Sequence, residues 1–160
     1  MINAMIIDDE KTARVVLREM LLEDCKNVNI VAESEDLHDA VKAIRKHKPD
    51  LIFLDIEMPG RSGLDILDFF NDDEIDFSII FTTAYNQYAV QAFKLSAIGY
   101  LLKPIESMEL IDAVKLHSKK ISKKNKIDYS VLKENFSSPN KIAVPTGNSI
   151  RFIELKNILF

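Results

Sequence analysis

The apolar residues of the first 121 positions follow two alternating spacings. Short, nearly continuous apolar runs bounded by turn residues are typical of strands buried on both faces. These runs cover residues 1–7, 28–32, 51–54, 77–82 and 97–102. Between them, apolar residues recur every three or four positions, which predicts one amphipathic helix after each strand. The predicted helices cover residues 13–21, 37–44, 63–70, 88–93 and 110–121.

Strands and helices therefore alternate five times along residues 1–121. This alternation is the signature of a parallel sheet with right-handed crossovers and helices on both faces. Five strands fit the doubly wound order 2-1-3-4-5. We expect an α/β domain here, with a ligand site at the carboxyl edge of its sheet.

The last 39 residues follow a different pattern. Residues 122–140 lose the apolar period and are rich in Lys, Ser and Asn, which predicts a linker. Alternating apolar residues flank a turn at 145–148, which predicts a β-hairpin. Because two strands alone are marginal in water, we expect the hairpin to be disordered or to pair with another chain through its exposed edges. Removal of residues 122–160 should then leave the first domain folded.

The charge differs between these two regions. Residues 1–120 hold 14 Lys and Arg against 22 Asp and Glu, a net −8, whereas residues 121–160 hold 7 against 3, a net +4. A basic segment after an acidic domain suggests an approach to a polyanion. The lysines between 115 and 126 leave two interpretations open: a solvated helix end that favours positive charge, or contact with DNA phosphates.

The sequence also predicts a cytoplasmic setting. Its single cysteine, Cys25, excludes an internal disulfide. The start of the chain lacks a signal-peptide pattern, and no apolar run has the roughly 20 residues needed to span a bilayer. We therefore expect no contact with a membrane.

Polar side chains follow four of the five predicted strands. They are Asp8 and Asp9 after the first strand, Asp55 after the third, Thr82 and Thr83 at the end of the fourth, and Lys103 after the fifth. Because the carboxyl ends of parallel strands meet at one edge, we expect these groups to lie close together. Carboxylates packed closely repel one another and favour a bound cation. An acidic, all-oxygen site suits Mg²⁺ or Mn²⁺.

Such a site is also suited to a phosphoryl group. The cation and Lys103 would neutralise the phosphoryl oxygens, so that Asp55 can attack phosphorus as a nucleophile. The opposing interpretation gives each residue a local role, with Asp9 capping the first helix and Lys103 pairing with any nearby acid. Four strand ends with compatible chemistry favour the shared site.

The segments around these strand ends resemble the receiver domain of two-component response regulators. They are Asp8-Asp9-Glu10, Asp55-Ile56-Glu57-Met58-Pro59 with Gly63, Thr83-Ala84 and Tyr100-Leu101-Leu102-Lys103-Pro104. The resemblance implies a flavodoxin-like fold and a signalling domain whose only catalysis is its own phosphorylation and dephosphorylation. It implies Asp55 as phosphoacceptor, Asp8, Asp9 and the backbone carbonyl of Glu57 as metal ligands, Thr83 and Tyr100 as switch residues, and Lys103 as the phosphate-binding lysine.

A second resemblance narrows the family. Residues 88–93 and 97–105 are similar to receivers attached to LytTR-type DNA-binding domains, and residues 141–160 to the opening strands of such a domain. This implies part of a longer transcription regulator that takes its phosphoryl group from a sensor histidine kinase. It further implies a dimer formed through the fourth helix, fifth strand and fifth helix. Promoter DNA would bind only to the complete DNA-binding domain.

Two other functions remain open at the level of the sequence. An aspartate-nucleophile phosphatase of the haloacid dehalogenase type needs an Asp as general acid two residues after its nucleophile, where this chain has Glu57. A receiver could also act through protein contacts alone, without DNA; the hairpin-like tail argues against that.

Several residues are interpreted as structural. His38, His47 and His117 lack the spacing of metal ligands, so we expect them on the surface or at helix ends. Tyr85, Tyr88 and Phe93 are expected to pack a helix rather than to line a ligand site.

Overall fold

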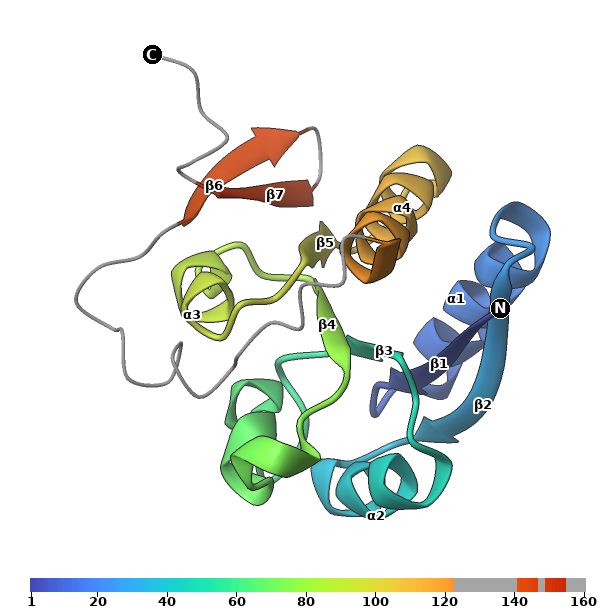
Figure 1. Cartoon of the computed structure of the whole chain (residues 1–160), viewed down its shortest axis with the longest axis vertical. Helices are drawn as coiled ribbons and strands as arrows, with labels where there is room; N and C mark the ends of the chain where they lie inside the picture. The colour runs from blue at the N-terminus through green and yellow to red at the C-terminus, as the bar shows by residue number, and fades with distance from the viewer. Residues whose placement is uncertain (123–140, 147–148, 155–160) are drawn as a thin grey trace.

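The structure is a computed structural model that describes residues 1–122, 141–146 and 149–154. Residues 1–122 contain five parallel strands in the order β2-β1-β3-β4-β5 (Figure 1). The strands are β1 (Ile2–Ile7), β2 (Val28–Ser34), β3 (Leu51–Leu54), β4 (Ser78–Thr83) and β5 (Gly99–Leu102). The predicted fold class and strand order are confirmed.

Helices cover both faces of this sheet (Figure 1). One face carries α1 (Lys11–Asp24) and α4 (Ser107–Ser122). The other carries α2 (Leu37–His47), the 3-10 helix η1 (Gly63–Phe69) and α3 (Ala89–Lys94). Among the described residues, no helix is both long enough and apolar enough to cross a bilayer.

Each face of the sheet has its own hydrophobic cluster. Successive residues of a strand point to opposite faces. Ile52 and Leu54 of β3 therefore pack on the α2 side, while Leu51 and Phe53 pack on the α1 side. All four side chains are fully buried. The continuous apolar run before Asp55 thus reflects a strand that is covered on both faces.

One predicted element differs in detail. Residues 63–70 were expected to form an α-helix and instead form the 3-10 helix η1, where Ser62 caps the start by accepting from the Leu64 N–H at 3.2 Å. The acidic segment that follows contains a further 3-10 turn, η2 (Asp72–Glu74), and Glu74 accepts from Arg45 Nε at 3.0 Å. Short connections favour 3-10 geometry because it needs fewer residues for each turn.

The C-terminal segment forms the predicted antiparallel hairpin, from β6 (Lys141–Thr146) and β7 (Ser149–Glu154). Pro145 and Thr146 belong to β6 rather than to the turn. The expectation that the hairpin is disordered or pairs with another chain is wrong, because β7 pairs antiparallel with β5 of the same chain. The open edge of β5 supplies the third strand that an isolated hairpin lacks. Within the described residues the sheet therefore has seven strands, in the order β2-β1-β3-β4-β5-β7-β6.

The chain closes tightly on the end of β3. The Gly63 N–H donates to the carbonyl of Ile56 at 2.8 Å, and the Ser62 hydroxyl donates to the same carbonyl at 3.3 Å. A β-carbon on Gly63 would lie 2.0 Å from the backbone carbonyl oxygen of Asp55. No rotamer can relieve a contact with backbone, so only glycine allows this approach.

His117 does not lie on the surface as expected. Its side chain is buried in α4, and among the described residues neither ring nitrogen has a hydrogen-bond partner. Burial lowers the pKa of His117; the charge of Asp50 opposes this shift and the charge of Lys120 adds to it. The spacing after Leu110 and Val114 places residue 117 on the inward face of the helix; only the polar imidazole pointed to the surface.

Substitution of Gly63 by Ala is expected to lower the free energy of unfolding by about 3 kcal/mol, since the strand end and the loop must separate. Gly60→Ala is the matched control. Gly60 has a φ of +89° but open space around a new β-carbon, so the loss should be about 1 kcal/mol. Urea unfolding of both variants measures the difference, and equal losses would contradict the packing of Gly63 on Asp55.

Acidification is expected to destabilise the wild-type protein more than a His117→Leu variant. Because burial lowers the folded-state pKa of His117 below its usual 6.5, the unfolded chain binds the proton first as the pH falls. The free energy of unfolding linked to His117 is fully present above its usual pKa of 6.5. It falls as the pH drops from there towards the lower pKa of the folded state, by up to about 1.4 kcal/mol per pH unit. Urea unfolding between about pH 7.5 and about pH 5.5 tests this, and equal pH slopes in the two proteins would refute it.

Candidate functional site

The predicted strand ends meet at the carboxyl edge of the sheet. Asp8 follows β1 directly, Asp55 follows β3 and Lys103 follows β5. Thr83 is the last residue of β4. The Asp55 N–H donates to the carbonyl of Ile7 at 2.9 Å, so pairing between β1 and β3 continues to the site itself. The buried strands thereby fix where each side chain starts.

Three carboxylates form a compact cluster. Asp8, Asp9 and Asp55 each offer an oxygen, and these oxygens all lie within 4.8 Å of one another. Asp8 and Asp55 are only 3% and 5% exposed, whereas Asp9 is half-buried. Grouped carboxylate oxygens of this kind are the ligands that hard divalent cations take in proteins.

Lys103 partly compensates this negative charge. Its Nζ donates to Asp8 Oδ2 at 2.6 Å and lies 3.5 Å from Asp55 Oδ2. Burial acts to lower the pKa of Lys103, but the hydrogen bond to Asp8 and the charge of Asp55 outweigh it and raise the pKa. The ammonium is therefore charged, and it faces both carboxylates from a strand far away in the sequence.

Asp55 is the carboxylate with the perturbed acidity. Burial raises its pKa to about 6; Lys103 lowers it, the neighbouring Asp8 raises it, and the hydrogen bond from the Ile56 N–H lowers it. That N–H donates to Asp55 Oδ1 at 2.8 Å. At neutral pH the group is mostly ionised yet poorly solvated, which suits a nucleophile.

Thr83 and Tyr100 lie on one chain of contacts. Both are fully buried. The Thr83 hydroxyl oxygen accepts from the Tyr85 N–H at 3.3 Å, and the Tyr100 hydroxyl donates to the Tyr85 carbonyl. Burial raises the pKa of Tyr100 to about 12, so its hydroxyl keeps the proton that it donates. The backbone of Tyr85 therefore connects the two side chains.

Two tyrosines have roles that the sequence did not reveal. Tyr85 and Tyr88 were interpreted as helix packing. Both precede the first residue of α3, with their rings edge to face at 6.3 Å, and Tyr88 does pack against the hydrophobic cluster under α3. The Tyr88 hydroxyl donates to Glu57 Oε1 at 2.5 Å and ties this loop to the one after Asp55. The sequence could have indicated these roles, because both tyrosines follow closely after the strand that ends at Thr83.

A further contribution comes from Arg14 on α1. Its Nη1 donates to the backbone carbonyl of Asp8 at 2.6 Å, and its Nε lies 3.6 Å from Glu33. The guanidinium thus holds the chain at the point where β1 turns into the acidic site. The side chain of Glu57 is exposed, and the role of its backbone carbonyl as a metal ligand stays a prediction.

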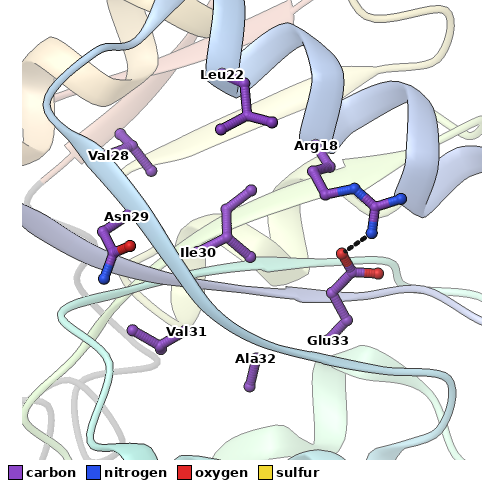
Figure 2. A pocket seen from close by; sticks show the side chains of 8 residues that line it. All are labelled: Arg18, Leu22, Val28, Asn29, Ile30, Val31, Ala32 and Glu33. Atoms are coloured by element: carbon purple, nitrogen blue, oxygen red, sulfur yellow. Dashed lines mark hydrogen bonds and ion pairs between the residues drawn. The ribbon is translucent and has the colours of Figure 1, made fainter.

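A hollow along the edge strand β2 is separate from the acidic cluster. It has a volume of about 360 Å³ between α1 and β2, and Leu22, Val28 and Ile30 are among its lining residues (Figure 2). Arg18 donates to Glu33 at 2.6 Å across one end. Its lining contains none of the strand-end residues discussed above, so we do not assign the reaction to it.

Comparison with known proteins agrees with this geometry. A family model described as the response regulator receiver domain matches residues 4–115. The sensory transduction protein LytT of Bacillus anthracis is 31% identical over the whole chain, and the transcriptional regulatory protein BtsR of Salmonella typhi is 36% identical over 160 residues. The chain spans 65% of the length of each of these relatives.

A solved structure gives the same answer for the fold. The response regulatory domain of mrkE from Klebsiella pneumoniae matches with a TM-score of 0.67 and 28% sequence identity. The match covers 76% of this chain and 99% of that domain. With more than half of its length matched by the family model, and with the acidic cluster and lysine at the carboxyl edge of its sheet, the chain belongs to the receiver domain family of two-component response regulators.

Proposed function

We propose that Asp55 is the phosphoacceptor of this phosphorylation-switched receiver. One observation carries the proposal: Lys103 Nζ contacts both Asp8 and Asp55 beside a cluster of three carboxylates. An ammonium beside an ionised carboxylate that belongs to a cluster able to hold a cation is what a nucleophile needs to approach an anionic phosphoryl group.

Mg²⁺ or Mn²⁺ fits the donor set of this site. Asp8, Asp9 and Asp55 would hold it, and the backbone carbonyl of Glu57 would complete the set. A bound divalent cation supplies positive charge that neutralises the phosphoryl oxygens and the excess carboxylate charge. The raised pKa of Asp55 supports this assignment, because burial and the charge of Asp8 leave the carboxylate under-compensated.

The chemical step is a phosphoryl transfer. A carboxylate oxygen of Asp55 attacks phosphorus, the bond between phosphorus and the donor atom breaks, and an acyl phosphate forms on Asp55. The donor keeps the electron pair of the broken bond. Lys103 already lies between Asp8 and Asp55, so its ammonium can turn to the new phosphoryl oxygens without leaving the site.

The phosphoryl group would then act on Thr83 and Tyr100. A phosphoryl oxygen attracts the Thr83 hydroxyl, which at present accepts from the Tyr85 N–H. That movement disturbs the backbone of Tyr85, whose carbonyl holds the Tyr100 hydroxyl. One or two charge-assisted hydrogen bonds are enough to bias a two-state arrangement of this kind.

For the complete protein we propose control of transcription. The donor would be a sensor histidine kinase, the phosphorylated form would dimerise, and DNA would bind through a LytTR-type domain that begins near residue 141. The relatives named as sensory transduction and transcriptional regulatory proteins support this output. We expect the protein to act in the cytoplasm.

The phosphatase alternative is less well supported. It would need Glu57 as a free general acid, yet the Glu57 carboxylate accepts a hydrogen bond from Tyr88. Membership of the receiver family favours a stoichiometric acceptor over turnover of phosphate esters.

Incubation with acetyl phosphate and Mg²⁺ is expected to add one phosphoryl group to the wild-type chain, as read from its intact mass. Asp55→Asn should abolish this addition, while Asp68→Asn, a change on the exposed part of η1, should not. Lys103→Met should slow the addition by roughly 10- to 100-fold, because it removes a charged hydrogen-bond donor. Undiminished phosphorylation of the Asp55→Asn variant would refute the assignment, and chelation of the metal should mimic that variant.

Beryllofluoride with Mg²⁺ is expected to strengthen self-association of the wild-type protein by at least about 10-fold, the effect of one charge-assisted hydrogen bond. Thr83→Val should lose this response while still binding beryllofluoride. Thr82→Val is the matched control, because Thr82 is a buried neighbour whose side chain points to the opposite face of β4. Sedimentation equilibrium measures the association constants. Equal responses in the two variants would contradict the role of Thr83.

A further inference from the structure

β5 is the point where the C-terminal hairpin meets the receiver. Without the hairpin, β5 would be an edge strand with one row of unpaired backbone groups. β7 occupies this edge by pairing Ile150 with Tyr100 and Ser149 with Leu101. β6 contacts α3, so the hairpin covers both the edge of β5 and the neighbouring helix (Figure 1).

Tyr100 belongs to two sets of contacts at once. Its backbone lies in the β5–β7 ladder, opposite Ile150. Its hydroxyl donates to the Tyr85 carbonyl, and the Tyr85 N–H donates to Thr83. Three consecutive contacts therefore connect Thr83 to the hairpin: Thr83 with Tyr85, Tyr85 with Tyr100, and Tyr100 with Ile150.

The contact with β5 is also the weaker of the two ladders that β7 makes. β5 and β7 share two residue pairs, whereas β6 and β7 share six, from Lys141 with Glu154 to Thr146 with Ser149. A small bias at Tyr100 can thus detach the hairpin from the receiver before the hairpin itself opens.

The outer edge of the docked hairpin offers a further strand one N–H fewer at Pro145. β6 is the last strand of the sheet and carries Pro145, which has no N–H to offer to a neighbour. The docked state therefore ends the sheet within one chain. It also covers β5 and α3, which belong to the face that the receiver resemblance assigns to dimerisation, so docking and that dimer exclude each other.

We propose that the β6–β7 hairpin is an autoinhibitory strand addition: it docks on β5 while Asp55 is unphosphorylated and leaves when phosphorylation moves Tyr100. The inference rests on the proposed phosphorylation of Asp55. Release would expose the edge of β5 and α3 to a second copy, and it would free the opening strands of the following domain in the same event.

Hydrogen exchange of the full 160-residue chain tests the docking itself. The edge amides of β5, between residues 99 and 102, are expected to exchange at least 10-fold faster in Ile150→Pro than in the wild type. The matched variant Ile150→Val keeps the N–H and the strand preference, so it should behave as the wild type. The amides of β1 and β3 should stay unchanged in both and show that the receiver is folded. Equal exchange at β5 in all three proteins would overturn the docking, whatever happens at Asp55.

Beryllofluoride with Mg²⁺ tests the release. Bound beryllofluoride is detected independently by fluorine NMR, and in the wild type, at a protein concentration that keeps it monomeric, it should raise exchange at β5 at least 10-fold, to the level of Ile150→Pro. Binding without faster exchange would overturn this inference and leave the proposed function intact. No binding at all would refute the proposed function, and the inference with it. Sedimentation shows whether the protein is a monomer before beryllofluoride is added. If the β5 amides are protected from exchange only in a dimer, the hairpin pairs with β5 of a second copy, and docking within one chain is overturned.

Discussion

Two carboxylates are buried side by side at the end of this sheet, and one ammonium faces both. Asp8 and Asp55 would repel each other strongly in a poorly solvated site. Lys103 neutralises one of the two negative charges. Burial raises the pKa of Asp55 to about 6, an effect that Lys103 opposes and Asp8 reinforces. The carboxylates leave the site with a net negative charge, which a bound cation would compensate. The bound cation would then attract an anionic phosphoryl group.

This unbalanced cluster depends on the rigidity of the strands below it. Asp55 cannot withdraw into solvent, because Leu51 to Leu54 are covered on both faces and Gly63 closes the loop onto the Asp55 carbonyl. Asp8 is held in the same way by β1 and by Arg14 at its carbonyl. The free energy of burying the strands therefore keeps together charges that would otherwise separate.

The strand ends could be predicted from the sequence because their causes are local. A continuous apolar run followed by Asp55, or by Lys103, marks a buried parallel strand that ends at the ligand edge of its sheet, and parallel geometry brings such ends together. The contacts of Tyr85, Tyr88 and His117 could not be predicted in this way. Tyr85 donates and accepts through its backbone, and Tyr88 reaches Glu57, which lies in another loop. His117 stands at an inward position of its helix, but the polarity of an imidazole favours the surface over burial.

The hairpin was correctly predicted as a hairpin but misplaced, and the reason lies in the edges of the sheet. Sequence pattern shows that two strands need a third, yet it does not show which edge in the molecule is open. β3 and β4 are paired on both sides, so their backbones cannot change partners in response to Asp55 or Thr83. β5 has a neighbour on one side only within the receiver and carries Tyr100 at the end of the contacts that start at Thr83. β5 is the edge strand next to β4, so a signal that starts at Thr83 can reach a docked strand through the backbone of β5, where β7 is docked.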